Sequence, residues 1–226
     1  MVVGNGMMAN KFMDCYKDDP TVILFASGVS NSNEIDEDKY TRELILINNC
    51  LTKYPQYKLV YFSSVIHLSD MKTRYLDHKR EVERLLMNKS QNYLVIRLPQ
   101  VVGIGGNKNN IINYFDSCVK NDIPLKVQTN TIRSVVDIND VFNIVKLCID
   151  RYQNTMLNLS YIEKIYVDEL ASLIFELNNR PKNIVNQPAG HSILSNNSPI
   201  VDEIIEELNI NRHNYTQRVL RKYITA

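Results

Sequence analysis

Tyr75 and Lys79 stand four residues apart in a segment whose pattern predicts a helix. From Lys72 to Met87 the apolar residues recur at roughly helical spacing, and the segment contains neither Gly nor Pro. Residues i and i+4 share one helical face, so the phenol and the ammonium can reach the same small volume. A neighbouring cation favours the tyrosinate form, which suits such a pair to proton transfer. The alternative is an ordinary pair of solvated side chains.

A second chemical pattern lies at the start of the sequence. Met1-Val2-Val3 is a short apolar strand that runs into Gly4-Asn5-Gly6-Met7-Met8-Ala9, and a helical pattern follows to about Lys17. This is a GxGxxA turn between a strand and a helix. Its glycines let the backbone approach a pyrophosphate, and the helix N-terminus supplies N–H groups and partial positive charge. The turn therefore predicts a dinucleotide site, with a plain tight turn as the alternative.

The stretch after this turn is shorter than a dinucleotide-binding unit requires. The acidic residue that reads the adenosine ribose is expected about 20 residues beyond the glycines, after a second strand. Here Asp18-Asp19-Pro20 ends the first helix, and the strand Thr21–Ala26 runs directly into Ser27-Gly28, which resembles a loop on the nicotinamide side. One strand–helix pair is therefore missing, and the sequence does not specify NAD or NADP.

The remaining chain alternates apolar strands of about five residues with longer helices. Strands are predicted at 58–62, 93–97, 125–128 and 156–159, and helices at 40–54, 72–87, 110–120, 138–152, 167–177, 200–208 and 216–223. This alternation predicts an α/β fold with a shortened, Rossmann-like doubly wound parallel sheet. We expect 1–102 and 131–160 to form the dinucleotide-binding part, and 103–130 and 161–226 a smaller substrate-binding part. Ser64 follows its strand at the end where such sheets bind ligands.

Composition excludes several other classes of protein. The 226 residues carry a formal charge of +1 and no basic stretch that would indicate nucleic-acid binding. The apolar runs are too short for a membrane span, and no secretory signal is recognisable. The four cysteines are scattered and the four histidines lack metal-ligand spacing, so we expect a cytoplasmic protein without a metal.

Taken together, these motifs resemble the extended short-chain dehydrogenases/reductases, in the group of nucleotide-sugar epimerases, dehydratases and reductases. Seven segments carry the resemblance in order: Gly4–Ala9, Leu24–Ser27, Val60–Ser64, Tyr75-x-x-x-Lys79, Arg97–Gly103, Arg133–Val141 and Asn158–Ser160. They extend over about 160 residues.

The resemblance implies a catalytic set of Ser64, Tyr75 and Lys79. Tyr75 would be the acid/base at a sugar hydroxyl or carbonyl, Ser64 would hydrogen-bond the same oxygen, and Lys79 would hold the nicotinamide ribose. Gln100 and Arg133 would hold the diphosphate of a nucleotide-diphosphate sugar; the alternative for Arg133 is a surface pair with Asp137. NAD or NADP would be bound by Gly4, Gly6, Met7, Ala9, Ala26, Ser27, Lys79 and Leu98. The resemblance also implies a homodimer formed through 40–54 and 72–87.

Departures from the family pattern narrow the reaction. Only 11 residues separate Ser64 from Tyr75, and Val65-Ile66 stand where the dehydratases carry Asp-Glu. Without these carboxylates we expect no dehydration. The leading hypothesis is an NAD(P)H-dependent reductase of the C4 keto group of a nucleotide-linked 6-deoxy sugar, serving synthesis of a surface polysaccharide. The alternatives are a 4-epimerase with retained NAD and a non-catalytic dinucleotide-binding scaffold.

Overall fold

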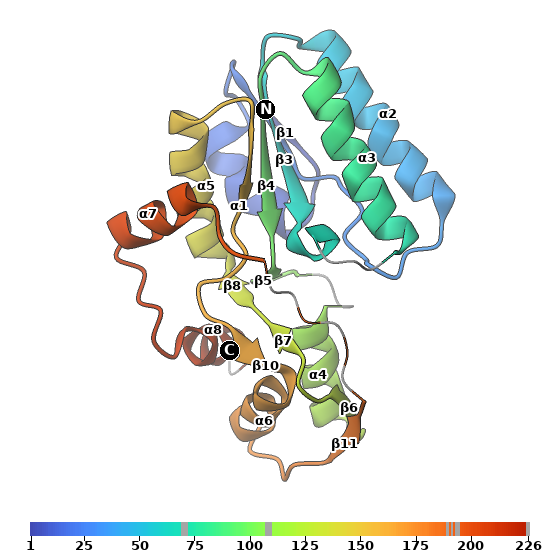
Figure 1. Ribbon diagram of the computed structural model, residues 1–226, viewed down its shortest axis with the longest axis vertical. Coiled ribbons are helices and arrows are strands. Elements are labelled where there is room, and N and C mark those ends of the chain that lie inside the picture. The colour runs from blue at the N-terminus through green and yellow to red at the C-terminus, as the bar shows by residue number, and fades with distance from the viewer. Residues whose placement is uncertain (69–71, 107–109, 189, 191, 193–194, 225–226) are drawn as a thin grey trace.

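A five-stranded parallel sheet forms the centre of the upper half of the molecule in Figure 1, a computed structural model that describes residues 1–68, 72–106, 110–188, 190, 192 and 195–224. Its strands are β1 (Val2–Val3), β2 (Val22–Phe25), β3 (Lys58–Ser64), β4 (Tyr93–Leu98) and β9 (Thr155–Asn158). They lie in the order β1-β2-β3-β4-β9, and every neighbouring pair is parallel.

Helices cover both faces of this sheet. The pair α2 (Glu37–Lys53) and α3 (Arg74–Lys89) packs on one face, and α1 (Met7–Tyr16) and α5 (Ile138–Arg151) pack on the other. Side chains alternate along β3, since Leu59 and Tyr61 join the cluster under α2 and α3 while Val60 joins the opposite one. A strand buried on both faces is a nearly continuous apolar run, as 59–62 is in β3. The predicted doubly wound parallel sheet is therefore confirmed.

The sheet ends at β1. The classic dinucleotide-binding order is 3-2-1-4-5-6, with two strands beyond the first. In this chain α1 leads directly to β2, which pairs with β1 (Val3 opposite Phe25), and no described strand pairs with the outer edge of β1. The sheet is shortened as predicted, but both strand positions beyond β1 are unfilled by the described residues, whereas the sequence predicted the loss of one strand–helix pair.

A smaller part lies beyond the carboxyl ends of these strands (Figure 1). It contains α4 (Ile111–Lys120), α6 (Val167–Leu177), α8 (Tyr215–Ile224) and three two-stranded pairings. These pair β5 (Gln100–Val102) with β8 (Val135–Asp137), β6 (Leu125–Gln128) with β11 (Ile184–Gln187), and β7 (Ile132–Arg133) with β10 (Ile165–Tyr166). Helix α7 (Pro199–Glu207) packs against α5 and β9.

The sequence analysis missed several of these short strands. Residues 100–102, which lie outside every predicted strand and helix, form β5, and β10 and β11 were not predicted either. Strands of two to four residues are too short to show a period, and their pairing partners are distant in sequence. A 3-10 turn, η1 (Val65–Leu68), follows β3 directly. None of the helices in the described part of the chain is long and apolar enough to cross a bilayer.

Candidate functional site

The predicted cofactor residues gather at the carboxyl edge of the sheet. Because all five strands are parallel, their carboxyl ends lie at one edge. Gly4 follows β1, Ala26 and Ser27 follow β2, and Ser64 and Leu98 end β3 and β4 as partners in register. The Ala26 N–H donates to the carbonyl of Val3 at 2.8 Å, which holds the first two strand ends together.

The two glycines of the first turn have different roles. Gly4 has φ +131°, and a Cβ there would lie 2.5 Å from the Ala26 carbonyl oxygen, so only glycine fits. Gly6 caps α1, and a Cβ there would meet no atom within 4 Å. The start of α1 has no side-chain cap and no acidic residue in its first turn, features that an anion-binding helix N-terminus requires.

A second glycine loop closes over the start of α1. A Cβ at Gly103 would lie 2.9 Å from the Met7 sulfur and 2.6 Å from Cγ2 of Ile138. The loop after β5 therefore packs directly on Met7 and on the start of α5. The sequence analysis did not select Gly103 as a site residue, and a glycine in the loop after a strand was the available signal.

Tyr75 and Lys79 both lie on the buried side of α3. Thr73 caps this helix by accepting the Leu76 N–H at 3.2 Å. The exposed fractions are 7% for Tyr75 and 2% for Lys79, and Lys79 Nζ lies 5.6 Å from the centre of the Tyr75 ring. The reading of two solvated side chains is therefore wrong. Ser64, the third predicted member, is buried at the end of β3, and its Oγ accepts the N–H of Ile66 at 3.3 Å.

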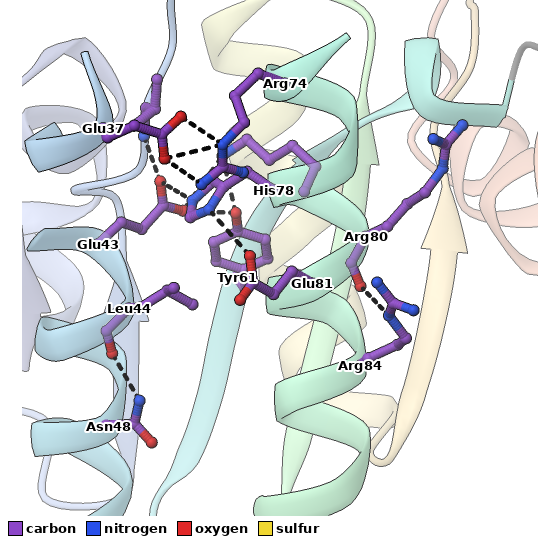
Figure 2. A network of polar contacts seen from close by, with 12 residues as sticks. Glu37, Glu43, Leu44, Asn48, Tyr61, Arg74, His78, Arg80, Glu81 and Arg84 are labelled. Carbon is purple, nitrogen blue, oxygen red and sulfur yellow. Dashed lines mark hydrogen bonds and ion pairs between the residues drawn. The ribbon is translucent and has the colours of Figure 1, made fainter. Parts of the chain in front are cut away.

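The ammonium of Lys79 is part of a buried polar network. Lys79 Nζ donates to the hydroxyl of Tyr61 at 2.8 Å and lies 3.3 Å from Oε1 of Glu43. The Tyr61 hydroxyl in turn donates to Glu43 Oε1 at 2.6 Å, and the Val29 N–H donates to Glu43 Oε2 at 2.6 Å. Figure 2 shows Glu43, Tyr61 and His78 turned toward one another between α2, β3 and α3.

Glu43 is ionised in this network although none of its surface is exposed. Burial alone would raise the pKa of its carboxyl group, but the charge of Lys79 and contacts with His78, Tyr61 and Val29 outweigh it and lower the pKa to about 2. His78 Nε2 lies 3.0 Å from Glu43 Oε2. Burial, followed by the charge of Glu43, raises the pKa of Tyr61 well above its usual value.

Sequence reasoning missed Glu43, Tyr61 and His78. One signal was present: Tyr40, Glu43, Ile47 and Cys50 recur at helical spacing and form the buried face of α2. A carboxylate in such a stripe needs a buried partner. The partner comes from α3, which no local pattern could identify.

Gln100 lies in β5, which pairs with β8, and Arg133 lies in β7, just before β8 in the chain. Gln100 begins β5, and its N–H donates to the Ser134 carbonyl at 3.3 Å, one residue beyond Arg133. Arg133 is partly buried in β7, and burial lowers the pKa of its guanidinium. Its Nη1 donates to the Ile132 carbonyl at 3.0 Å.

The Asp137 carboxylate, considered as a partner for Arg133, has other contacts. It accepts hydrogen bonds from Lys222 at 2.7 Å, Tyr223 at 2.9 Å and the backbone of Asn139 at 2.8 Å. Asp137 thus caps α5 and holds α8 against it. Within the described ranges, no three His, Cys, Asp or Glu side chains gather as a metal ion would require.

Several solved structures share this fold. The chain is similar to dTDP-glucose 4,6-dehydratase from Bacillus anthracis in complex with NAD, with 14% identity, a TM-score of 0.70, and coverage of 97% of this chain and 76% of that one. It is also similar to the Thermus thermophilus UDP-glucose 4-epimerase complex with NAD, with 13% identity, a TM-score of 0.70, and coverage of 96% of this chain and 80% of that one. A third similar structure is RMD from Pseudomonas aeruginosa complexed with NADPH, with 14% identity, a TM-score of 0.73, and coverage of 94% of this chain and 82% of that one.

These similarities show the fold. The chain has a shortened version of the Rossmann-like fold of these structures, since the alignments cover nearly all of this chain but only about four fifths of each of the others. No protein-family model matches the sequence, and no curated protein matches it.

Proposed function

We propose that this protein is an NAD(P)H-dependent oxidoreductase that reduces the C4 keto group of a nucleotide-activated 6-deoxy sugar. The observation that carries the proposal is the buried pair of Tyr75 and Lys79. It lies in a fold whose solved examples are nucleotide-sugar enzymes in complex with NAD or NADPH.

The first turn fits the pyrophosphate of a dinucleotide. Gly4 brings the backbone close to β2, and the uncapped start of α1 offers N–H groups beside the open space at Gly6. Met7 and Ala9 lie in the first turn of this helix, and Ala26, Ser27 and Leu98 line the adjoining strand ends. The strand that would carry an acidic ribose ligand has no counterpart among the described residues. NADH and NADPH are therefore both candidate cofactors.

The side chains at the sheet edge supply what ketoreduction needs besides hydride, which the bound dinucleotide would provide. Tyr75 would donate the proton to the sugar oxygen, and Ser64 would hydrogen-bond that oxygen as negative charge develops. Lys79 would hold the nicotinamide ribose, and Gln100 and Arg133 would bind the diphosphate.

The same set does not favour dehydration. Val65 and Ile66 follow Ser64 in η1, so the two positions that would carry an extra acid and base are apolar. Ketoreduction needs one proton donor and one ligand for the carbonyl, which the chain has.

The test is oxidation of NADH and NADPH with a panel of nucleotide-linked 4-keto-6-deoxy sugars, for wild type and Tyr75→Phe. We expect turnover that falls by about 10²–10⁴-fold in Tyr75→Phe. Ring burial is retained in this variant, so cofactor affinity and thermal stability should change little. Turnover that survives in Tyr75→Phe would contradict the role of Tyr75.

Two alternatives each have an observation in their favour. Epimerases are among the similar folds, and a nucleotide-sugar 4-epimerase would retain NAD through purification and convert a sugar without net oxidation. A non-catalytic scaffold is favoured by the Lys79–Glu43 ion pair, which could serve stability alone. Cofactor binding by the wild type, with neither ketoreduction nor epimerisation of any nucleotide sugar tested, would support the dinucleotide-binding scaffold.

The place and assembly of the protein belong to the same proposal. We propose a cytoplasmic homodimer formed through α2 and α3, acting in synthesis of a surface polysaccharide. Sedimentation of the purified protein tests the dimer.

A further inference from the structure

We propose that Glu43 is a positioning residue, which together with Tyr61 holds the Lys79 ammonium where it binds the nicotinamide ribose. This inference rests on the proposed function. It assigns to α2 a part in cofactor binding that neither the sequence motifs nor the fold identifies.

Lys79 Nζ has two hydrogen-bond acceptors among the described residues, one fewer than its donors. An ammonium has three hydrogen-bond donors. The Tyr61 hydroxyl at 2.8 Å and Glu43 Oε1 at 3.3 Å are the acceptors that the described residues place on Lys79. Two donors are thus directed into the protein, and the third can serve a ribose hydroxyl.

Glu43 is itself fixed from three sides. The Val29 N–H holds Oε2, the Tyr61 hydroxyl holds Oε1, and His78 Nε2 lies 3.0 Å from Oε2. These contacts come from the loop after β2, from β3 and from α3. The carboxylate therefore cannot follow Lys79 if the lysine moves, which makes it a fixed anchor.

The loop that would face the nicotinamide passes directly over this ion pair. A Cβ at Gly28 would lie 3.0 Å from both Glu43 Oε1 and Lys79 Nζ. Gly28 follows Ser27, one of the predicted cofactor residues. Glu43 and Lys79 thus lie directly against the loop of Ser27 and Gly28, so displacement of the Lys79 ammonium would change cofactor affinity.

A double-mutant cycle on cofactor affinity tests the assignment. The variants are Glu43→Gln, Lys79→Met and the double variant, and the readout is the dissociation constant of NADH and of NADPH, measured by fluorescence without substrate. Asp38→Asn, an exposed carboxylate on the same helix, is the matched control. Thermal unfolding of each variant confirms folding.

We expect Glu43→Gln to weaken binding by about 10-fold or more, the loss of a hydrogen bond to a charged group. Lys79→Met should weaken it at least as much, and the double variant should equal Lys79→Met, because Glu43 acts through Lys79. The direction of the change in affinity separates two effects, because loss of a negative charge near an anionic dinucleotide would by itself strengthen cofactor binding.

Three results would overturn the assignment. If the double variant weakened cofactor binding by the product of the two single-variant factors, Glu43 would not act through Lys79. If Glu43→Gln bound the cofactor as tightly as wild type or more tightly, the ion pair would have a structural role only. If Glu43→Gln does not fold, Tyr61→Phe keeps both charges and removes the bridging hydroxyl; unchanged affinity in that variant would also refute the assignment. Wild type that binds neither cofactor would instead refute the proposed function, and this inference with it.

Discussion

Acid should weaken the fold through Glu43, and the size of the effect follows from its environment. The pKa of this carboxyl group is lowered from 4.5 to about 2 in the folded protein. A carboxyl whose folded pKa is depressed stabilises the fold fully above its unfolded value, and loses that contribution as pH falls toward the folded value. At about 1.4 kcal/mol per pH unit, the 2.5-unit difference between 4.5 and about 2 corresponds to a total of about 3 kcal/mol. About 2 kcal/mol of this should be lost between pH 5 and pH 3.

Comparison with Glu43→Gln isolates this contribution, because the other carboxyl groups are common to both proteins. At pH 7 the variant should be less stable by about 3–5 kcal/mol, since it leaves the Lys79 ammonium buried without its anion. Urea unfolding at pH 5, 4 and 3 should show the two proteins converging by about 2 kcal/mol. A constant gap between wild type and Glu43→Gln would refute the reasoning.

Three further predictions concern other parts of the chain. Gly4→Ala should destabilise the fold by about 1–3 kcal/mol in urea unfolding, whereas Gly6→Ala should stay within about 1 kcal/mol and yet weaken dinucleotide binding; equal stability losses would contradict the different roles of the two glycines. Arg133→Lys should raise the KM for the nucleotide sugar about tenfold with little change in kcat, since lysine lacks the guanidinium fork, and an unchanged KM would remove this residue from the diphosphate site. Tyr215→Phe should cost about 1–3 kcal/mol, because the hydroxyl bonds the Asp140 carboxylate at 2.5 Å; thermal unfolding at neutral pH checks this, and an unchanged Tm would contradict it.

The parallel sheet covered by helices was predictable from the sequence alone. Apolar strands such as β3 and amphipathic helices such as α3 carry periods that a local reading detects, and their alternation implies a parallel sheet. The short interval between Gly6 and β2 also indicated a reduced sheet. The same local spacing placed Tyr75 and Lys79 on one helical face, because four residues are about one helical turn.

The surroundings of that pair depend on contacts between elements that are distant in sequence. The Glu43 carboxylate comes from α2, 36 residues before Lys79, and Tyr61 comes from β3, 18 residues before it. Each side chain is locally ordinary, and their contact exists because α2 and α3 pack together on one face of the sheet. The pairings of β5 with β8 and of β6 with β11 were equally beyond local reading. Such contacts depend on how distant elements pack, and no single stretch of sequence encodes that.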